Sequence, residues 1–313
     1  MAGTASSNLA RLRAIKETNF GETPSTGTSR DLRFTGESLN FAIQTDTSKE
    51  IRADRQIADL VQLGAEASGD VQFELSYGSF DDYIAAALGG AWTEDVLQNG
   101  TNVPFFSIEK GFTDINQFIL FRGMAVNTMS LDFAIGSILT GSFGFMGKDS
   151  VIAGTSGVPA AASGGEMTEV MNSATNFADL MIGGVAYDCG ISQISLSTDA
   201  GLRAQNSVGK LGACKINPGT FSPTGSMTVY FADAAIYSKY LANTPFSLSW
   251  AVEDAAGNRY DFVLPKVKIT SANPTAGGLD TDVELAIEYQ ALYDATAGYT
   301  IQITREAAPA PAP

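Results

Sequence analysis

Apolar and polar residues alternate along much of the chain with a period of two, which is typical of β-strands. Such alternation places the apolar side chains on one packed face of a sheet and leaves the other face wet or paired. The pattern therefore predicts a mainly β protein. The apolar positions of the expected strands are Leu39, Phe41, Ile43; Val71, Phe73, Leu75, Tyr77; Met129, Leu131, Phe133, Ile135; Phe246, Leu248, Trp250, Val252; Tyr260, Phe262, Leu264; and Val283, Leu285, Ile287, Tyr289.

The alternation stops between residues 148 and 176, where Gly, Ala, Ser and Thr predominate. This composition is typical of a linker or a long surface arm. The final residues, EAAPAPAP, cannot form a core and are expected to be extended. We therefore expect an N-terminal arm (1–36), a first β domain (37–150), a linker or arm (151–185), a second β domain (186–305) and a disordered Ala/Pro tail (306–313).

The two expected domains share one order of elements. In each, a strand ends in Thr-Asp (residues 45–46 and 198–199), a polar stretch leads to Leu-Gly, and a second strand precedes a helix. FSIEK at 106–110 then matches FSLSW at 246–250. Repeated order of this kind indicates internal duplication. We expect two tandem β-sandwich or barrel-like domains, each with a flanking α-helix.

The stretch SYGSFDDYIAAALGGAW, residues 76–92, predicts the helix of the first domain. Its apolar residues recur at helical spacing, and the glycine pair after them supplies a stop. Ser79 is expected to cap the helix in a capping box with Asp82, while Asp81 favours the positive end of the helix dipole. Asp233 is the expected cap of the second helix.

The absence of histidine excludes Ser-His-Asp catalysis, Cys-His catalysis and HExxH zinc sites. A hydrolase that uses only carboxylates needs two that face each other across the substrate. Asp81 and Asp82 are adjacent on a first helical turn, and no separated pair stands out. No phosphate-binding glycine motif occurs either. We therefore expect no enzyme activity, no cofactor and no metal.

Cysteine usage and hydropathy limit the setting of the protein. Cys189 and Cys214 have no CxxC partner, so two buried free thiols are expected rather than a zinc site or a disulfide framework. The N-terminal residues lack the apolar core of a secretory signal, and no apolar run is long enough to span a bilayer. We expect a soluble chain that is made in the cytoplasm and does not contact a membrane.

The charge balance bears on possible nucleic-acid contacts. The chain has 19 Lys and Arg against 34 Asp and Glu, a formal net charge of -15. This is the wrong sign for a surface that grips phosphates. Any contact with DNA is therefore expected to be non-adhesive.

The densest group of charges lies in DTSKEIRADRQIADL, residues 46–60. A solvated loop of mixed charge is the simplest interpretation. However, loops of about 20 residues are long for a compact domain, and long loops are often functional. We expect this loop to dock on a neighbouring subunit.

Residues 11–92 resemble the major tail tube proteins of long-tailed, non-contractile bacteriophages. The most specific stretches are KETNFGETP, LRFTGESL, SKEIRADRQ, GDVQFELSYGSFDD and ALGGAW. The resemblance implies a structural protein whose β domains assemble side by side into rings. Stacked rings then form a hollow tube through which phage DNA passes without specific binding. The Ala/Pro tail has no counterpart in the family.

The resemblance also implies which segments make contacts between rings. In the family these are a long loop between strands and an N-terminal arm, which correspond to residues 46–68 and 8–36; the loop of the second half is 199–224. The implied interface residues are Leu32, Phe34, Glu50, Ile51, Arg52, Asp54, Arg55 and Asp59. Further implied partners are the tape measure and tail terminator proteins, and the implied location is the virion.

Duplication and charge sharpen these expectations. If each half occupies one equivalent position, three chains form a pseudo-sixfold ring; if only one half lines the lumen, six chains are required. We expect the ring of three chains. A lumen with few cations would offer DNA phosphates no adhesive site. The alternative function is another β-rich module of a virion or cell surface, such as a decoration or glycan-binding protein.

Overall fold

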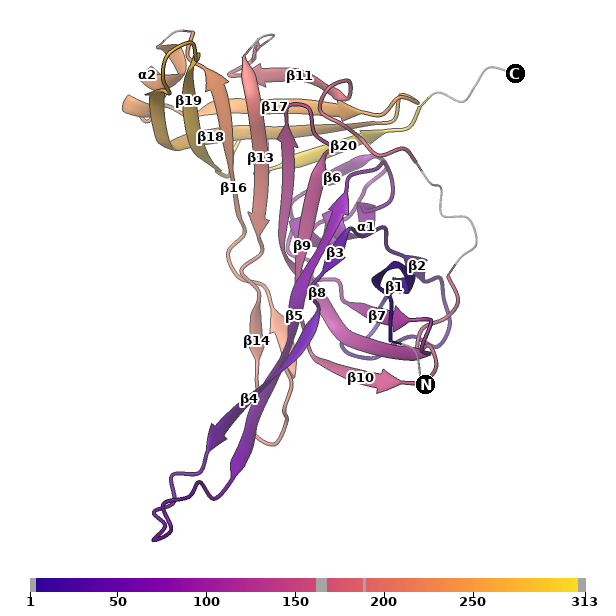
Figure 1. Cartoon of the computed structure of the whole chain (residues 1–313). Helices are drawn as coiled ribbons and strands as arrows, with labels where there is room; N and C mark the ends of the chain where they lie inside the picture. Colours follow the sequence, from indigo (N-terminus) through magenta and orange to yellow (C-terminus); the bar gives the residue numbers. More distant parts are fainter. Residues whose placement is uncertain (1–3, 162–167, 188–189, 233, 309–313) are drawn as a thin grey trace, which may run out of the picture.

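The computed structural model describes residues 4–161, 168–187, 190–232 and 234–308, and it confirms the mainly β class (Figure 1). The first half contains a short 3-10 helix (Ser7–Leu9), β1 (Ala10–Lys16), β2 (Arg30–Asp31), β3 (Gly36–Glu37), β4 (Asn40–Thr47), β5 (Leu60–Glu74), α1 (Asp81–Leu88), β6 (Val96–Gln98), β7 (Phe106–Phe112), β8 (Gln117–Ala134), β9 (Thr140–Gly147) and β10 (Asp149–Ala153).

The remaining elements belong to the second half. They are β11 (Phe177–Ile182), β12 (Val185–Ala186), β13 (Ile191–Asp199), β14 (Arg203–Gln205), β15 (Lys215–Asn217), β16 (Ser222–Tyr230), α2 (Ala235–Leu241), β17 (Phe246–Glu253), β18 (Arg259–Ala276), β19 (Val283–Ala291) and β20 (Gln302–Glu306). Neither described helix is long and apolar enough to cross a membrane.

A single run of antiparallel strands crosses both halves. The order is β4, β5, β9, β8, β13, β16, β19 and β18, and each strand pairs with the next. We call these strands the continuous ladder. The two halves join where β8 pairs with β13, with Leu131 opposite Leu196. The halves therefore share one sheet.

The pairing scheme of the first half recurs in the second. β4–β5–β9–β8–β7–β1 corresponds to β13–β16–β19–β18–β17–β11. Even the irregularities agree, because β8 shifts register against β9 between Val126 and Thr128, and β18 shifts against β19 between Ile269 and Ser271. β10 on β8 likewise corresponds to β20 on β18.

The strand register corrects the expected alignment of the halves. When the two bulges are superposed, Ser68 and Thr224 occupy equivalent positions, since they pair with Met146 and Gln290, which lie next to the bulges. Their other partners are Asn40 and Ser197. The Thr-Asp dipeptides are therefore not equivalent, because short β patterns match at several offsets.

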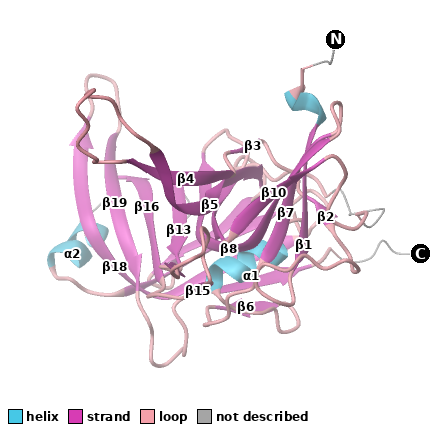
Figure 2. Cartoon of the chain, turned by 90° about the horizontal axis from the view of Figure 1, so that it is seen from below, coloured by secondary structure: helices cyan, strands magenta, loops and turns pink. Residues whose placement is uncertain are grey.

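The core lies between the continuous ladder and the strands and helices behind it. Phe73 stacks on Phe143 with ring centroids 4.6 Å apart, and Trp250 stacks on Phe262 at 5.1 Å. Burying each such side chain contributes about 1.5–3 kcal/mol. α1 packs on β8 and β13 from this side, so that it covers the junction between the halves (Figure 2).

Two expected boundaries need correction. β1 lies within the expected N-terminal arm, yet it pairs along its whole length with β7 and buries Leu12, Ala14 and Ile15. β11 lies within the expected linker and pairs with β17. Both segments supply an outer strand to a sheet. Residues 309–313 of the expected tail, and Cys189, lie outside the described residues, whereas Cys214 is a free, half-buried thiol.

Candidate functional site: a polar sheet face and two hairpins

The face of the continuous ladder that points away from the core is polar and acidic. Side chains alternate between the two faces of a strand, and directly paired residues share a face. Because the apolar partners are buried, the carboxylates on the other face point to solvent. These are Glu66, Asp70, Glu74, Asp132, Asp199, Glu284 and Glu288, none of which is buried.

Small hydroxyl side chains fill the positions between these carboxylates. The hydroxyl groups of Ser130 and Ser142 lie 2.9 Å apart across β8 and β9, and those of Ser195 and Ser226 lie 2.8 Å apart across β13 and β16. The ladder segments 66–74, 128–132, 140–144, 193–199, 224–228, 271–275 and 284–288 contain no Lys or Arg. Lys268 of β18 lies on the same face just beyond these segments, opposite Gln290, so the face presents mainly negative charge and neutral hydroxyls to solvent.

The expected capping box of α1 is wrong. The N-cap residue is Phe80, and no side chain makes a cap hydrogen bond. Ser79 instead accepts a hydrogen bond from the Ser76 hydroxyl at 2.8 Å, so its oxygen is directed away from the helix. The expected stop is confirmed, since Gly89 adopts a left-handed conformation with φ 63°.

Asp81 joins α1 to the second half of the chain. Its carboxylate, on a residue only 8% exposed, accepts hydrogen bonds from the guanidinium of Arg305 and from the phenol of Tyr260. Arg305 also pairs with Asp95 at 3.1 Å and lies over the ring of Trp92. Asp81 is therefore an anchor between elements, which is a different role from the expected dipole partner.

Burial and charge set the protonation of this cluster. Burial, followed by the charge of Asp81, raises the pKa of Tyr260 well above its usual value. Burial disfavours the charged form of Arg305, but hydrogen bonds to Asp81 and Asp95 outweigh it and raise the pKa of the guanidinium. The cluster thus holds a neutral phenol beside an ion pair. Sequence gave no local signal for it, because Tyr260 and Arg305 lie in another half of the chain.

Asp82 has no comparable role. Its side chain is 56% exposed and lies 3.8 Å from Arg30. The expected cap of α2, Asp233, lies outside the described residues, and the N-cap position of α2 is Ala234. The two adjacent aspartates thus face different surroundings, Asp81 the second half of the chain and Asp82 the solvent.

The charged loop is the tip of a long β-hairpin formed by β4 and β5, which projects from the body (Figure 1). Ser48 and Asp59 close the tip with a backbone hydrogen bond of 2.9 Å. Glu50, Ile51, Arg52, Asp54, Arg55 and Asp59 all lie in this tip and are exposed. The expected loop of 46–68 is therefore shorter, because β5 begins at Leu60.

Exposed apolar side chains line this hairpin. Ile51 is 99% exposed, and Ile57, Leu60 and Leu63 are exposed as well. Arg52 grips Asp54 within the tip at 2.8 Å, and this hydrogen bond lowers the pKa of Asp54. Large apolar side chains gathered on a projecting element are typical of a docking surface.

A second hairpin lies beside the base of the first. β14 and β15 pair with each other within the expected loop 199–224. The backbone N–H of Ala65 donates to the carbonyl of Leu211 at 2.7 Å, which holds the two hairpins together. Leu202 and Ile216 pack on Ala125 of β8. Each half of the chain thus extends a hairpin, and the two hairpins lie together.

The resemblance placed Leu32 and Phe34 on an N-terminal arm that contacts another ring. In the structure, this segment is fixed to the body of its own chain. Both are half-buried and pack against the core of their own chain. The N–H of Leu32 donates to the carbonyl of Leu12 at 2.9 Å, which fixes the segment to β1. Their position next to β1 makes them part of the fold.

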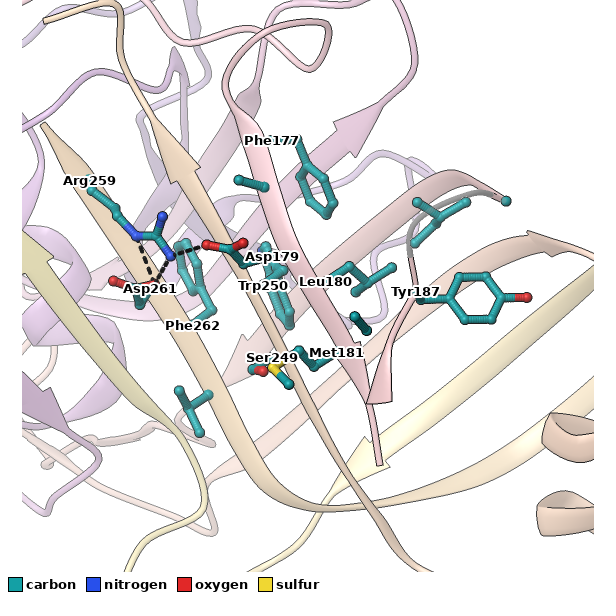
Figure 3. Close-up of a pocket in the computed structure, with 15 residues that line it drawn as sticks. Phe177, Asp179, Leu180, Met181, Tyr187, Ser249, Trp250, Arg259, Asp261 and Phe262 are labelled. Atoms are coloured by element: carbon teal, nitrogen blue, oxygen red, sulfur yellow. Dashed lines mark hydrogen bonds and ion pairs between the residues drawn. The ribbon is translucent and has the colours of Figure 1, made fainter. Parts of the chain in front are cut away.

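A pocket lies between β11, β17 and β18 (Figure 3). Its aromatic residues include Trp250 and Phe262, which stack on each other and are each only 1% exposed, and the half-buried Phe177 and Tyr187. Arg259 on its rim is held by Asp179 at 2.6 Å and Asp261 at 2.7 Å. A glycan-binding site needs exposed aromatic faces, and neither Trp250 nor Phe262 offers one.

Comparison with known proteins identifies one family. A family model described as phage tail tube protein matches residues 7–291, which includes both halves and both hairpins. No curated protein matches the chain.

Proposed function

Because the chain belongs to the phage tail tube protein family, we propose that it is the repeating structural subunit of a tail tube. Copies assemble side by side into rings, and the rings stack into a hollow conduit that delivers DNA into the host. The protein is a component of the virion, is made in the host cytoplasm and has no catalytic role. Its further partners are the tape measure and tail terminator proteins.

The polar face of the continuous ladder carries this proposal. DNA binds proteins mainly when cations displace its counterions, and this face sets seven carboxylates beside Lys268. The seven carboxylates would repel the phosphates of a passing duplex, and the serine pairs would hold water between the protein and the DNA. We assign this face to the lumen, since it would let DNA slide without sticking.

The extent of the ladder favours rings of three chains. Both halves contribute four strands to the same sheet, and the pairing scheme repeats between them. Each half then occupies one equivalent position, as expected from an internal duplication, and three chains give a pseudo-sixfold ring. A ring of six chains would require one half to leave the lumen, although the halves share a sheet.

The two hairpins are suited to contacts between stacked rings. Both project to the same side of the body (Figure 1), and apolar side chains near their tips, such as Ile51 and Val208, are exposed in the single chain. Docking would bury Ile51, Ile57, Leu60 and Leu63 against the neighbouring ring. The charged residues at the tip, such as Arg52 and Arg55, would then fix the register of stacking.

Negative-stain electron microscopy of the purified full chain tests the proposal. Rings or tubes with an axial hole are the expected result, and rotational averaging of end views gives the subunit count. A chain that remains monomeric at high concentration, as measured by light scattering, would overturn the proposal. A protein that binds DNA tightly at physiological salt would overturn the assignment of the polar face to the lumen.

A further inference from the structure

The continuous ladder ends in two unpaired strand edges. Across the described ranges, no strand pairs with the outer edge of β3 and β4, or with the outer edge of residues 270–276 in β18. Open edges of this length are templates for pairing with another chain. The first edge belongs to the first half of the chain and the second to the last half.

The repeat contains two strand edges that correspond to these open edges, those of β13 and β8, and they pair with each other. In the repeat, β13 corresponds to β3 and β4, and β8 corresponds to β18. β13 and β8 form the junction between the halves, with Ser197 opposite Ser130. The chain therefore contains one example of the contact that its two open edges could make.

Resting on the proposed function, we infer that the open edge of β18 in one copy pairs antiparallel with the open edge of β3 and β4 in the next copy. The register follows from the internal junction. Asn40 lies opposite Asn273, as Ser197 lies opposite Ser130, and residues 36–42 of one copy cover residues 271–277 of its neighbour. Repetition of this contact closes the ring.

Backbone directions agree with this pairing. In an antiparallel strand, the N–H and C=O of one residue point to the same side, and successive residues alternate. Ser38 donates to Asp70 in β5, so the groups of Glu37, Leu39 and Phe41 point to the open edge. Phe231 donates to Val283. The backbone groups of Val283 therefore point toward β16. Because successive residues alternate, the backbone N–H and C=O groups of residues 284, 286 and 288 point toward β18.

The open side of β18 follows from that alternation. Residues 271, 273 and 275 are paired with these even residues of β19 and use their backbone groups there. The groups of Ala272, Pro274 and Ala276 therefore point outward. In the inferred register they face Phe41, Leu39 and Glu37, so each outward residue meets an outward residue.

Pro274 has no N–H, and the inferred register places it where none is needed. Its partner is Leu39, whose carbonyl already accepts a hydrogen bond from the Lys110 ammonium group at 3.2 Å. The N–H of Leu39 donates to the Glu37 carboxylate at 2.9 Å. In the inferred pairing, this N–H would leave the carboxylate and donate to the carbonyl of Pro274. The missing donor thus leaves no backbone acceptor unpaired.

α2 provides a second, independent observation. α1 packs on both β8 and β13, and every residue of α1 except Asp82 is buried. α2 packs chiefly on β18, and only Ile236 of its residues is buried, while Leu241 is 69% exposed. A β4 strand from the next copy would take the place beside α2 that β13 takes beside α1.

Disulfide cross-linking of the full chain tests the register. Asn40 and Asn273 are inferred to form a non-hydrogen-bonded pair, in which Cα atoms lie about 4.5 Å apart, within the reach of a disulfide. Asn40→Cys with Asn273→Cys, in a background of Cys189→Ser and Cys214→Ser, is expected to give covalent dimers and trimers on non-reducing gels. Reduction should return them to monomer.

Two matched variants make the result specific. Ser130→Cys with Ser197→Cys has the same geometry inside one chain and is expected to form an intramolecular disulfide without oligomers. Asn40→Cys with Thr275→Cys shifts the register by two residues, so that the cross-linked yield falls at least tenfold. Cross-linking of the shifted pair as strongly as the inferred pair would overturn the register.

The same samples separate this inference from the proposed function. If microscopy shows rings or tubes while the Asn40–Asn273 pair gives no interchain disulfide and the Ser130–Ser197 control oxidises, the inference is wrong and the tube assignment stands. If the unsubstituted chain forms no ring, the proposed function itself fails. A covalent ladder that ends at the hexamer would support the edge pairing and overturn the trimer.

Discussion

The first half of the chain buries its helix, whereas the second half leaves its helix largely exposed. The strand pairings around α1 and α2 are the same, but only α1 has a strand of the other half beneath it. α1 is also tied down by Asp81, to which α2 has no described equivalent. Both halves thus have the same order of paired strands, but they differ in their contacts. The first half is joined to the second through β8 and β13, whereas the equivalent edge of β18 is open.

Truncation of equivalent helix ends should show the largest contrast. Leu88 of α1 is fully buried, and Leu88→Ala is expected to lower the free energy of unfolding by about 2–5 kcal/mol. Leu241→Ala in α2 removes an exposed side chain and should change the unfolding free energy of the monomer by less than about 0.5 kcal/mol. Urea denaturation of both variants measures this.

The Leu241→Ala variant, which should change stability least, is expected to have the larger effect on assembly. Leu241→Ala should weaken ring formation, as measured by light scattering across a concentration series, because the inferred pairing would cover α2 with a strand of the next copy. Equal stability losses in the two variants would show that α2 is packed within its own chain.

Loss of the Asp81 anchor should have the next largest effect. Asp81→Ala leaves Tyr260 without its acceptor and Arg305 with only Asp95, and is expected to lower the unfolding free energy by roughly 1–3 kcal/mol. Asp82→Ala, one residue away but exposed, is the matched control and should stay within about 0.5 kcal/mol. Thermal unfolding of both variants tests this, and similar losses would return Asp81 to a role in the helix alone.

Alkaline pH should weaken the same anchor to a smaller extent. Burial raises the pKa of Tyr260 above the usual 10.0, so the folded chain keeps a proton that the unfolded chain loses. The stabilising contribution is complete below pH 10 and falls above it, by about 1.4 kcal/mol per pH unit. Tyr260→Phe should flatten the slope of unfolding free energy between pH 10 and 11, whereas Tyr293→Phe, at an exposed position, should not.

The hairpin tip should affect folding least. Arg52→Glu with Arg55→Glu is expected to leave the melting temperature within about 2 °C, because the tip is fully exposed. Stacking should nevertheless fail, so that microscopy shows rings or short tubes. Arg52→Lys with Arg55→Lys keeps the charge and should stack. Tubes of normal length in the Glu variant would remove the tip from the interface between rings.

The sequence predicted strands well where one face is buried. Val71 and Phe73 in β5, and Leu248 and Trp250 in β17, alternate with polar residues and lie in the core. β1 shows the same alternation in Arg11, Leu12 and Arg13, but the family resemblance implied an arm there. The tip end of β5 was missed, because both of its faces are exposed and the period-two signal is absent there.

Contacts between distant residues were not predictable from one sequence. The spacing of Ser79 and Asp82 is compatible with a capping box, but Ser76 competes for the hydroxyl of Ser79. Asp81 is directed by Arg305 and Tyr260, which are brought to it only by the fold. The polar face was likewise invisible, because alternation shows which side of a strand is wet but not which strands lie side by side.

Both backbone groups of Leu39, at the open edge of the sheet, are already hydrogen-bonded to side chains. In the single chain, its N–H is engaged by Glu37 and its carbonyl by Lys110, so an arriving strand must displace a side chain before it gains a backbone bond. In the inferred pairing, each encounter between copies would be an exchange with a small net gain, so a misplaced neighbour would dissociate readily. A closed ring, in which every subunit is held on two sides, would accumulate more of these exchanges than an open chain. The selection of correctly placed subunits would then be a property of one strand edge.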